Sequence, residues 1–176
     1  MTTPLLSFTI ALLATTAVSP SNQNTTRAQH DFDYQFGTWN VHVRRFVPAE
    51  KRWVTYTGTH IVKPLWNGRA NIGVLEIRGS AGSIEALQLR LYDPAARQWK
   101  LSFASSADGE LQRPSVGRFF GKNAEFFNNA SIGGKPAIVR TESTVASARK
   151  YCDVIAYSLD RGKRWTNVWI ANYDKQ

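Results

Sequence analysis

From residue 32 onward the chain is a series of short segments rich in Val, Ile, Thr, Phe, Tyr and Trp, separated by Gly, Pro, Asn and Asp. Apolar and polar residues alternate within many of these segments, which is the period of a half-buried β-strand. No window supports a long amphipathic helix. The pattern predicts about ten strands, at residues 39–47, 52–62, 71–77, 84–92, 99–105, 116–120, 124–127, 137–145, 149–158 and 165–173.

The connections between these segments carry turn signals. Gly121-Lys122-Asn123 separates two of them and predicts a tight hairpin. Pro64 and Pro94 end two others, because proline cannot donate to a strand ladder. Regular spacing with short turns is typical of an antiparallel sandwich or barrel. We predict an all-β fold, a single antiparallel β-barrel, because closure of about ten strands leaves no exposed sheet edge.

The alternation does not decide which face of each strand lines the barrel. In the segment at residues 84–92, Leu87, Leu89 and Leu91 share one face, whereas Ile84, Ala86, Gln88, Arg90 and Tyr92 share the other. Both faces are therefore partly apolar. This is expected of a barrel with an enclosed lumen and an outer surface that loops partly cover.

The N-terminal segment has a different character. Residues 5–18 are apolar and uncharged, too few for a membrane-spanning helix, and are followed by small residues and a polar stretch. The order predicts a signal peptide at residues 1–17, a flexible lead-in at 18–29 and a barrel domain at 30–176, although the usual positive start is missing. The alternative is a buried N-terminal helix. We expect a periplasmic or secreted protein with no integral membrane span in the mature chain.

Composition limits the chemistry further. The 176 residues include one cysteine, Cys152, which excludes a disulfide framework and a cysteine-based zinc site. The alternation around Cys152 predicts a buried position within a strand. The 22 basic and 13 acidic residues give a net charge of +9, but the basic residues are dispersed and form no recognisable nucleic-acid module. We expect no nucleic-acid partner, and the excess charge favours anionic ligands or surfaces.

A short motif stands at the first predicted strand. Gly37-Thr38-Trp39 resembles the G-x-W signature of lipocalin-like (calycin) barrels, in which the Trp plugs the closed end and the Gly permits close backbone approach. More widely, residues 30–173 resemble the uncharacterised bacterial family DUF1579. The shared motifs are F-x-F-x-x-G-x-W, L-R-L-Y-D-P and S-x-D-G-G-x-x-W, which correspond here to residues 32–39, 89–94 and 158–165. The resemblance implies a lipocalin-like barrel and no particular activity.

The third of these motifs also matches the Asp-box of sialidase propellers, S-x-D-x-G-x-x-W. A propeller repeats this motif once per blade, and the chain contains it once, with no internal repeat. We therefore interpret residues 158–165 as a hairpin device, in which Asp160 caps the turn and Trp165 packs beneath it.

Several polar residues in the predicted strands are candidates for a site. The histidines, at positions 30, 42 and 60, show no metal-binding spacing, so we expect no metal and no cofactor. His60 is the first candidate for a proton carrier, because imidazole titrates near neutral pH. A lumen-facing Arg90 or Arg140 would bind a carboxylate or phosphate, and Glu142 shares a face with Arg140 and would pair with it. Each of these residues has a structural alternative on an ordinary strand face.

These residues lead to two main hypotheses. In the first, the barrel binds a small, partly apolar ligand, with an anionic head group as one option. The residues expected to contact the ligand are Trp39, Tyr56, His60, Arg90, Tyr92, Arg140, Asn167 and Trp169. In the second, the lumen belongs to a cofactor-free isomerase, cyclase or hydrolase that uses His60, Glu142 and Arg90. A third option is a barrel that acts through its outer surface. The oligomeric state stays open.

Overall fold

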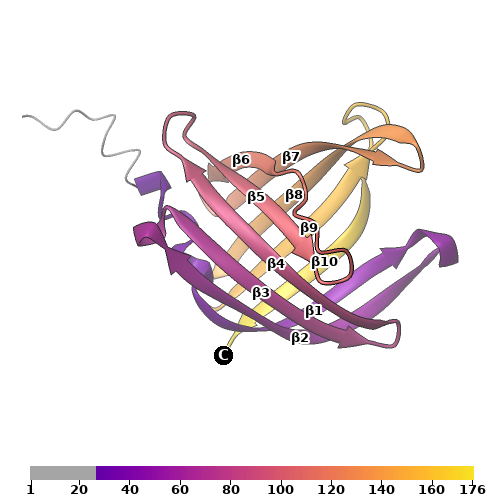
Figure 1. Cartoon of the computed structure of the whole chain (residues 1–176), viewed down its shortest axis with the longest axis horizontal. Coiled ribbons are helices and arrows are strands. Elements are labelled where there is room, and N and C mark those ends of the chain that lie inside the picture. Colours follow the sequence, from indigo (N-terminus) through magenta and orange to yellow (C-terminus); the bar gives the residue numbers. More distant parts are fainter. Residues whose placement is uncertain (1–26) are drawn as a thin grey trace, which may run out of the picture.

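A computed structural model describes residues 27–176, and the expected signal peptide lies outside these residues. Ten strands form one closed sheet in which each strand pairs antiparallel with its sequence neighbours and the last pairs with the first (Figure 1). Three short 3₁₀ turns, η1 (Asp33–Gln35), η2 (Pro48–Glu50) and η3 (Trp66–Gly68), accompany them. The strands are β1 (Gly37–Val47), β2 (Arg52–Leu65), β3 (Ala70–Gly79), β4 (Gly82–Asp93), β5 (Gln98–Ser105), β6 (Ser115–Phe120), β7 (Asn123–Ile132), β8 (Lys135–Ser147), β9 (Lys150–Ser158) and β10 (Thr166–Lys175).

The predicted all-β closed barrel is confirmed. The strand bounds differ most in β7, which continues five residues beyond the expected end at Phe127, through Asn128-Asn129-Ala130-Ser131-Ile132. Asn128 and Asn129 have low strand propensity, but the segment pairs in register with β8, so tertiary pairing overrides the local preference. No helix among residues 27–176 is long and apolar enough to cross a membrane.

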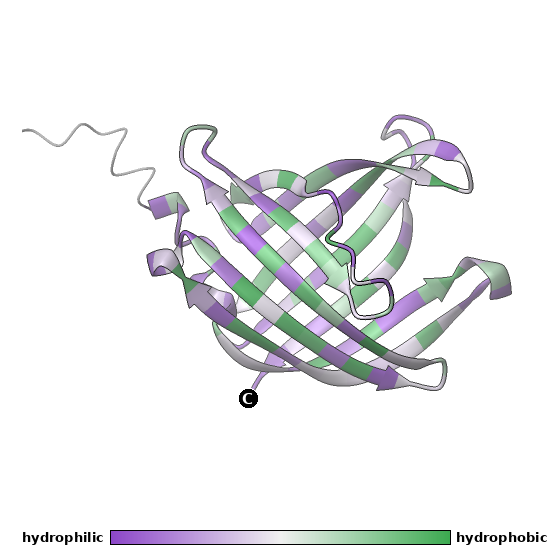
Figure 2. Cartoon of the chain, viewed as in Figure 1, coloured by the Kyte–Doolittle hydropathy of each residue, from purple (hydrophilic) through white to green (hydrophobic). Residues whose placement is uncertain are grey.

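The face of β4 that lines the barrel is the more polar one. Arg90 is 3% exposed and Gln88 7% exposed, whereas Leu87 on the opposite face is 45% exposed. Hydrophilic and hydrophobic residues alternate along many of the strands (Figure 2). The polar face of β4 can point inward because polar side chains in the lumen can form hydrogen bonds with one another.

The N-terminal segment closes one end of the barrel. Trp39 is fully buried and donates from Nε1 to the carbonyl oxygen of Gln35 at 2.7 Å. Gly37, with φ +115°, makes the turn into β1 that this arrangement needs. The buried Trp39 agrees with the role expected of the Trp of the G-x-W motif. Gly37 is required for its positive φ and not for close backbone approach, since a Cβ there would lie 3.4 Å from the side chain of Lys175. Phe32 packs edge-on against Trp99, with ring centroids 4.9 Å apart, and fills the space beside η1.

The expected flexible lead-in overlaps the described residues only at 27–29. In that overlap Ala28 accepts a hydrogen bond of 3.1 Å from Nε1 of Trp99. The first residues of the described chain therefore contact the barrel.

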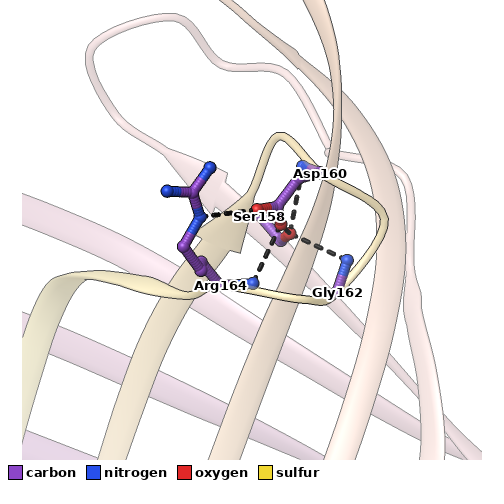
Figure 3. Close-up of polar contacts among 4 residues, drawn as sticks. All are labelled: Ser158, Asp160, Gly162 and Arg164. Atoms are coloured by element: carbon purple, nitrogen blue, oxygen red, sulfur yellow. Dashed lines mark hydrogen bonds and ion pairs between the residues drawn. The ribbon is translucent and has the colours of Figure 1, made fainter.

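The hairpin device predicted at residues 158–165 connects β9 to β10 (Figure 3). Ser158 donates from its hydroxyl to Asp160, and the amide of Gly162 donates to that same hydroxyl at 2.8 Å. Asp160 accepts from the backbone amide of Arg164 at 2.9 Å and from its guanidinium at 2.8 Å. The loop is therefore fixed by side-chain capping. Trp165 lies under the guanidinium of Arg140, 4.4 Å from its ring centroid.

The closed end yields a test of the Trp39 role. Trp39→Phe removes a buried hydrogen bond and leaves the Gln35 carbonyl oxygen without that donor, so we expect a loss of about 2–4 kcal/mol in the free energy of unfolding. Urea denaturation measures it. Trp66→Phe is the matched control, because Trp66 is 67% exposed and its replacement should change stability by no more than about 0.5 kcal/mol. Equal effects of the two substitutions would contradict the role given to Trp39.

Candidate functional site

The barrel contains an internal cavity of about 170 Å³ that is partly open to solvent. It lies toward the end of the barrel where β3 turns into β4, because Ile84 and Ala86 at the start of β4 line it. Six of its ten lining side chains are apolar and four are polar. The lining residues are Leu75, Ile84, Ala86, Phe103, Ile155 and Trp169, together with Gln88, Thr141, Asp153 and Tyr173.

Larger hollows occur on the outside of the barrel. The largest, about 600 Å³, lies between the β7–β8 hairpin and the loop that follows β9, and Lys135 and Leu159 are among its residues. These hollows are shallow and open to solvent. The internal cavity is smaller, but its walls come from six strands and surround a ligand on most sides, which is the arrangement that small-molecule sites usually have.

Asp153 is the ionisable residue of the cavity wall. It lies on β9 and accepts a hydrogen bond from the hydroxyl of Ser143 on β8. Burial raises the pKa of Asp153 to about 6, although the Ser143 hydrogen bond and the positive charge of Arg90 oppose the shift. Sequence reasoning missed this residue. The available signal was a single acidic residue between Tyr151 and Ile155 on the same face of a predicted strand.

Arg90 lies behind one part of this wall. Its Nη1 donates to Oδ1 of Asn71 at 2.8 Å, and its Nη2 donates to Oε1 of Gln88. The guanidinium also stands 5.1 Å from the ring centroid of Phe32. No ion pair to Arg90 is present among residues 27–176. Neutral amides therefore hold this buried cation, and Gln88 separates it from the cavity.

His60 lies deeper, beside two stacked tyrosines. Its Nδ1 is 3.1 Å from the hydroxyl of Tyr151, whose ring stacks on Tyr173 with centroids 4.0 Å apart. Its Nε2 has no partner among the described residues. A Cβ on Gly73 would lie 2.4 Å from that nitrogen, so the glycine makes room for the ring. Burial and the charge of Arg90 lower the pKa of His60 to about 3.

His60 is therefore neutral at physiological pH. The reason for nominating it as a proton carrier was titration near pH 7, and that property is absent. The structure corrects this part of the expectation, because desolvation of the imidazole outweighs its ordinary basicity.

Six of the eight predicted contact residues lie inside the barrel, in three groups. Trp169 lines the cavity. His60 and Arg90, as described, lie behind its walls. Trp39, Tyr56 and Tyr92 are also buried within the barrel, but they belong to its two core clusters. The barrel thus gathers six of the eight predicted residues inside, while the cavity itself touches one of them.

Arg140, Glu142 and Asn167 do not face the lumen. Arg140 and Glu142 alternate along β8 with the buried Thr141 and Ser143, and their side chains form the expected ion pair, at 3.0 Å, on the outer surface. Asn167 is exposed, next to a register shift between β9 and β10. The ion pair was predicted correctly, but on the lumen face. Both faces of β8 contain polar residues, so the sequence does not show which face points inward.

The remaining candidates for chemistry are Cys152 and clusters of metal-binding side chains. Cys152 is half-buried, and burial raises the pKa of its thiol, which disfavours the nucleophilic thiolate. Residues 27–176 contain no cluster of three or more His, Cys, Asp or Glu side chains that could hold a metal ion.

Comparisons with known proteins agree on the fold. No protein-family model matches the chain, and no curated protein matches it. Among solved structures, Rv2717c from M. tuberculosis superposes with a TM-score of 0.56 at 12% identity, over 91% of this chain and 99% of that one. The S-type phycobiliprotein lyase CPES from Guillardia theta gives a TM-score of 0.56 at 10% identity, over 90% of this chain and 98% of the lyase.

A redesigned β-barrel, mFAP1, bound to DFHBI, is less similar, with a TM-score of 0.47 at 10% identity, over 83% of this chain and 99% of that one. Together with the strand topology, the two stronger matches define the protein as a closed, ten-stranded, calycin-like β-barrel. At these identities the likeness concerns the fold alone.

The raised pKa of Asp153 predicts a pH dependence of stability. The folded protein holds this proton up to about pH 6, whereas an unfolded aspartate releases it near about pH 4. The native state therefore binds more protons between these values, and this carboxyl contributes less stability as the pH rises through them. We expect Asp153→Asn to become more stable relative to the wild type as the pH rises from 4 to 7, measured by urea denaturation.

Asp174→Asn is the control for this measurement. Its hydrogen bond to Lys150 lowers the pKa of Asp174, so the variant should lose stability relative to the wild type as the pH rises, and only in a window below about pH 4. A relative stability of Asp153→Asn that is constant between pH 4 and 7 would contradict the raised pKa.

Proposed function

We propose that the barrel binds one small, largely apolar molecule in its internal cavity. The observation that carries the proposal is the cavity inside the barrel, which six apolar and four polar side chains line. A barrel whose only role is structural would fill this volume with side chains, since voids cost packing energy.

The size of the cavity limits the ligand. A volume of about 170 Å³ is close to that of apolar cavities, about 150 Å³, that take up benzene. The ligand that fits is a single ring or a short aliphatic chain with one small substituent. Trp169 and Phe103 are the aromatic walls against which a ring would pack.

An anionic head group has less support than the sequence suggested. That option rested on Arg90 and Arg140 in the lumen. Arg140 lies outside, Gln88 separates Arg90 from the cavity, and the charged group on the cavity wall is the carboxyl of Asp153. The cofactor-free enzyme has no specific observation in its favour, because Glu142 lies on the outer surface, away from His60 and Arg90.

Two further parts of the interpretation rest on sequence motifs. We propose that the chain is exported, on the strength of the uncharged apolar segment at residues 5–18. We also propose kinship with the DUF1579 family, supported by the three shared motifs. The calycin-like fold and the buried Trp39 are consistent with that kinship.

Filling the cavity should abolish binding. Ala86→Leu places a branched side chain into the space beside Phe103 and Trp169, and we expect toluene and benzyl alcohol to bind at least tenfold more weakly than to the wild type. Isothermal titration calorimetry measures the affinities. Ala104→Leu is the matched control, because Ala104 pairs with the outward-facing Leu87 and its replacement should leave both affinities unchanged.

Equal affinity of the wild type and Ala86→Leu would place binding elsewhere on the molecule. Native mass spectrometry of the purified protein provides an independent measurement. A retained molecule should be found in the wild type and in Ala104→Leu, and should be lost from Ala86→Leu.

A further inference from the structure

Four polar side chains face the cavity, and they define what a ligand can present there. Arg90 connects two of them, since it donates to Gln88 and its charge lowers the pKa of Asp153. Gln88 comes from β4, Thr141 from β8, Asp153 from β9 and Tyr173 from β10. The rest of the wall is apolar. A ligand in the cavity therefore has one polar end, and the hydrogen bonds that these four residues have left open determine its chemistry.

Gln88 and Asp153 offer complementary groups. The carbonyl oxygen of the Gln88 side chain accepts from Arg90, which fixes the amide and leaves its NH₂ group as a donor. Asp153 accepts from the hydroxyls of Ser143 and Tyr173, and because a carboxylate has about four lone-pair sites, it keeps capacity for a further donor. The wall thus presents a donor and an acceptor, with the hydroxyls of Thr141 and Tyr173 beside them.

The charges around the cavity disfavour an ionic head group of either sign. A carboxylate or phosphate would meet the carboxyl of Asp153 directly. An ammonium group would lose its hydration in a mostly apolar space, and the guanidinium of Arg90 behind Gln88 would repel it. Arg90 and an ionised Asp153 together carry no net charge, so a neutral ligand leaves their balance undisturbed.

We propose that the ligand carries one uncharged group that both donates and accepts a hydrogen bond, such as a hydroxyl or a primary amide, on an apolar body of about one ring. Its O–H or N–H donates to Asp153, and its oxygen accepts from the amide of Gln88. This assignment rests on the proposed function, and it adds the chemical class of the ligand.

Four probes that share a benzene ring and one carbon test the assignment: toluene, benzyl alcohol, benzoate and benzylamine. They differ only in having no head group, a neutral one, a negative one or a positive one. At pH 7, isothermal titration calorimetry should show benzyl alcohol binding at least tenfold more tightly than each of the other three.

Variants connect that preference to Asp153. Asp153→Leu should reduce the ratio of the benzyl alcohol affinity to the toluene affinity to about one, whereas Asp153→Asn, which keeps an acceptor, should retain most of it. Glu142→Gln, on the outer surface, is the control and should leave the ratio unchanged. Because the readout is a ratio within one variant, a general change in stability does not imitate the result.

The outcomes separate the two proposals. Tightest binding of benzoate or benzylamine overturns the assignment of a neutral head group and leaves the proposed function in place. Equal binding of toluene and benzyl alcohol by the wild type also overturns the assignment of a neutral head group and leaves the proposed function in place. If none of the four probes binds, both the assignment and the proposed function are overturned.

Discussion

Closure of the sheet is the constraint on which the rest of the molecule depends. β10 pairs with β1 from Arg45–Trp169 to Trp39–Lys175, and this pairing converts a ten-stranded meander into a ring without free edges. Once the ring is closed, inward-facing side chains must either fill the interior or surround a space. At one end the aromatic residues around Trp39 fill it, and toward the other end they leave a cavity.

The interior contains more polarity than a packed core would tolerate without compensation. Arg90, His60 and Asp153 are buried together, and each is stabilised in a different way: neutral amides hold the guanidinium, loss of a proton keeps the imidazole neutral, and a hydroxyl donates to the carboxyl. Arg90 and Asp153 follow the rule that buried polar groups find hydrogen-bond partners, whereas Nε2 of His60 has no partner among the described residues. The polar side chains that line the cavity are the part of this network that a ligand can contact.

The fold was predictable from sequence because strand alternation and turn residues are local signals. The ten strands followed from them, whereas the expected role of Trp39 came from the resemblance of its G-x-W motif to lipocalin-like barrels. The site was less predictable, because it depends on which face of each strand turns inward. In β4 the polar face does so, and in β8 the face of Arg140 and Glu142 does not. Asp153 had no motif around it, and only the register between β8 and β9 brings it to Ser143.

The two ends of the described chain leave the barrel at the same pole. Residues 27–35 cover the closed end, and the backbone amide of Gln176 donates to the carbonyl oxygen of Thr38 at 3.1 Å, beside Trp39 (Figure 1). The cavity lies toward the opposite pole, near the turn between β3 and β4. A surface or carrier joined directly at Arg27 or at Gln176 would therefore lie at the pole opposite the cavity, whichever of the two was tethered.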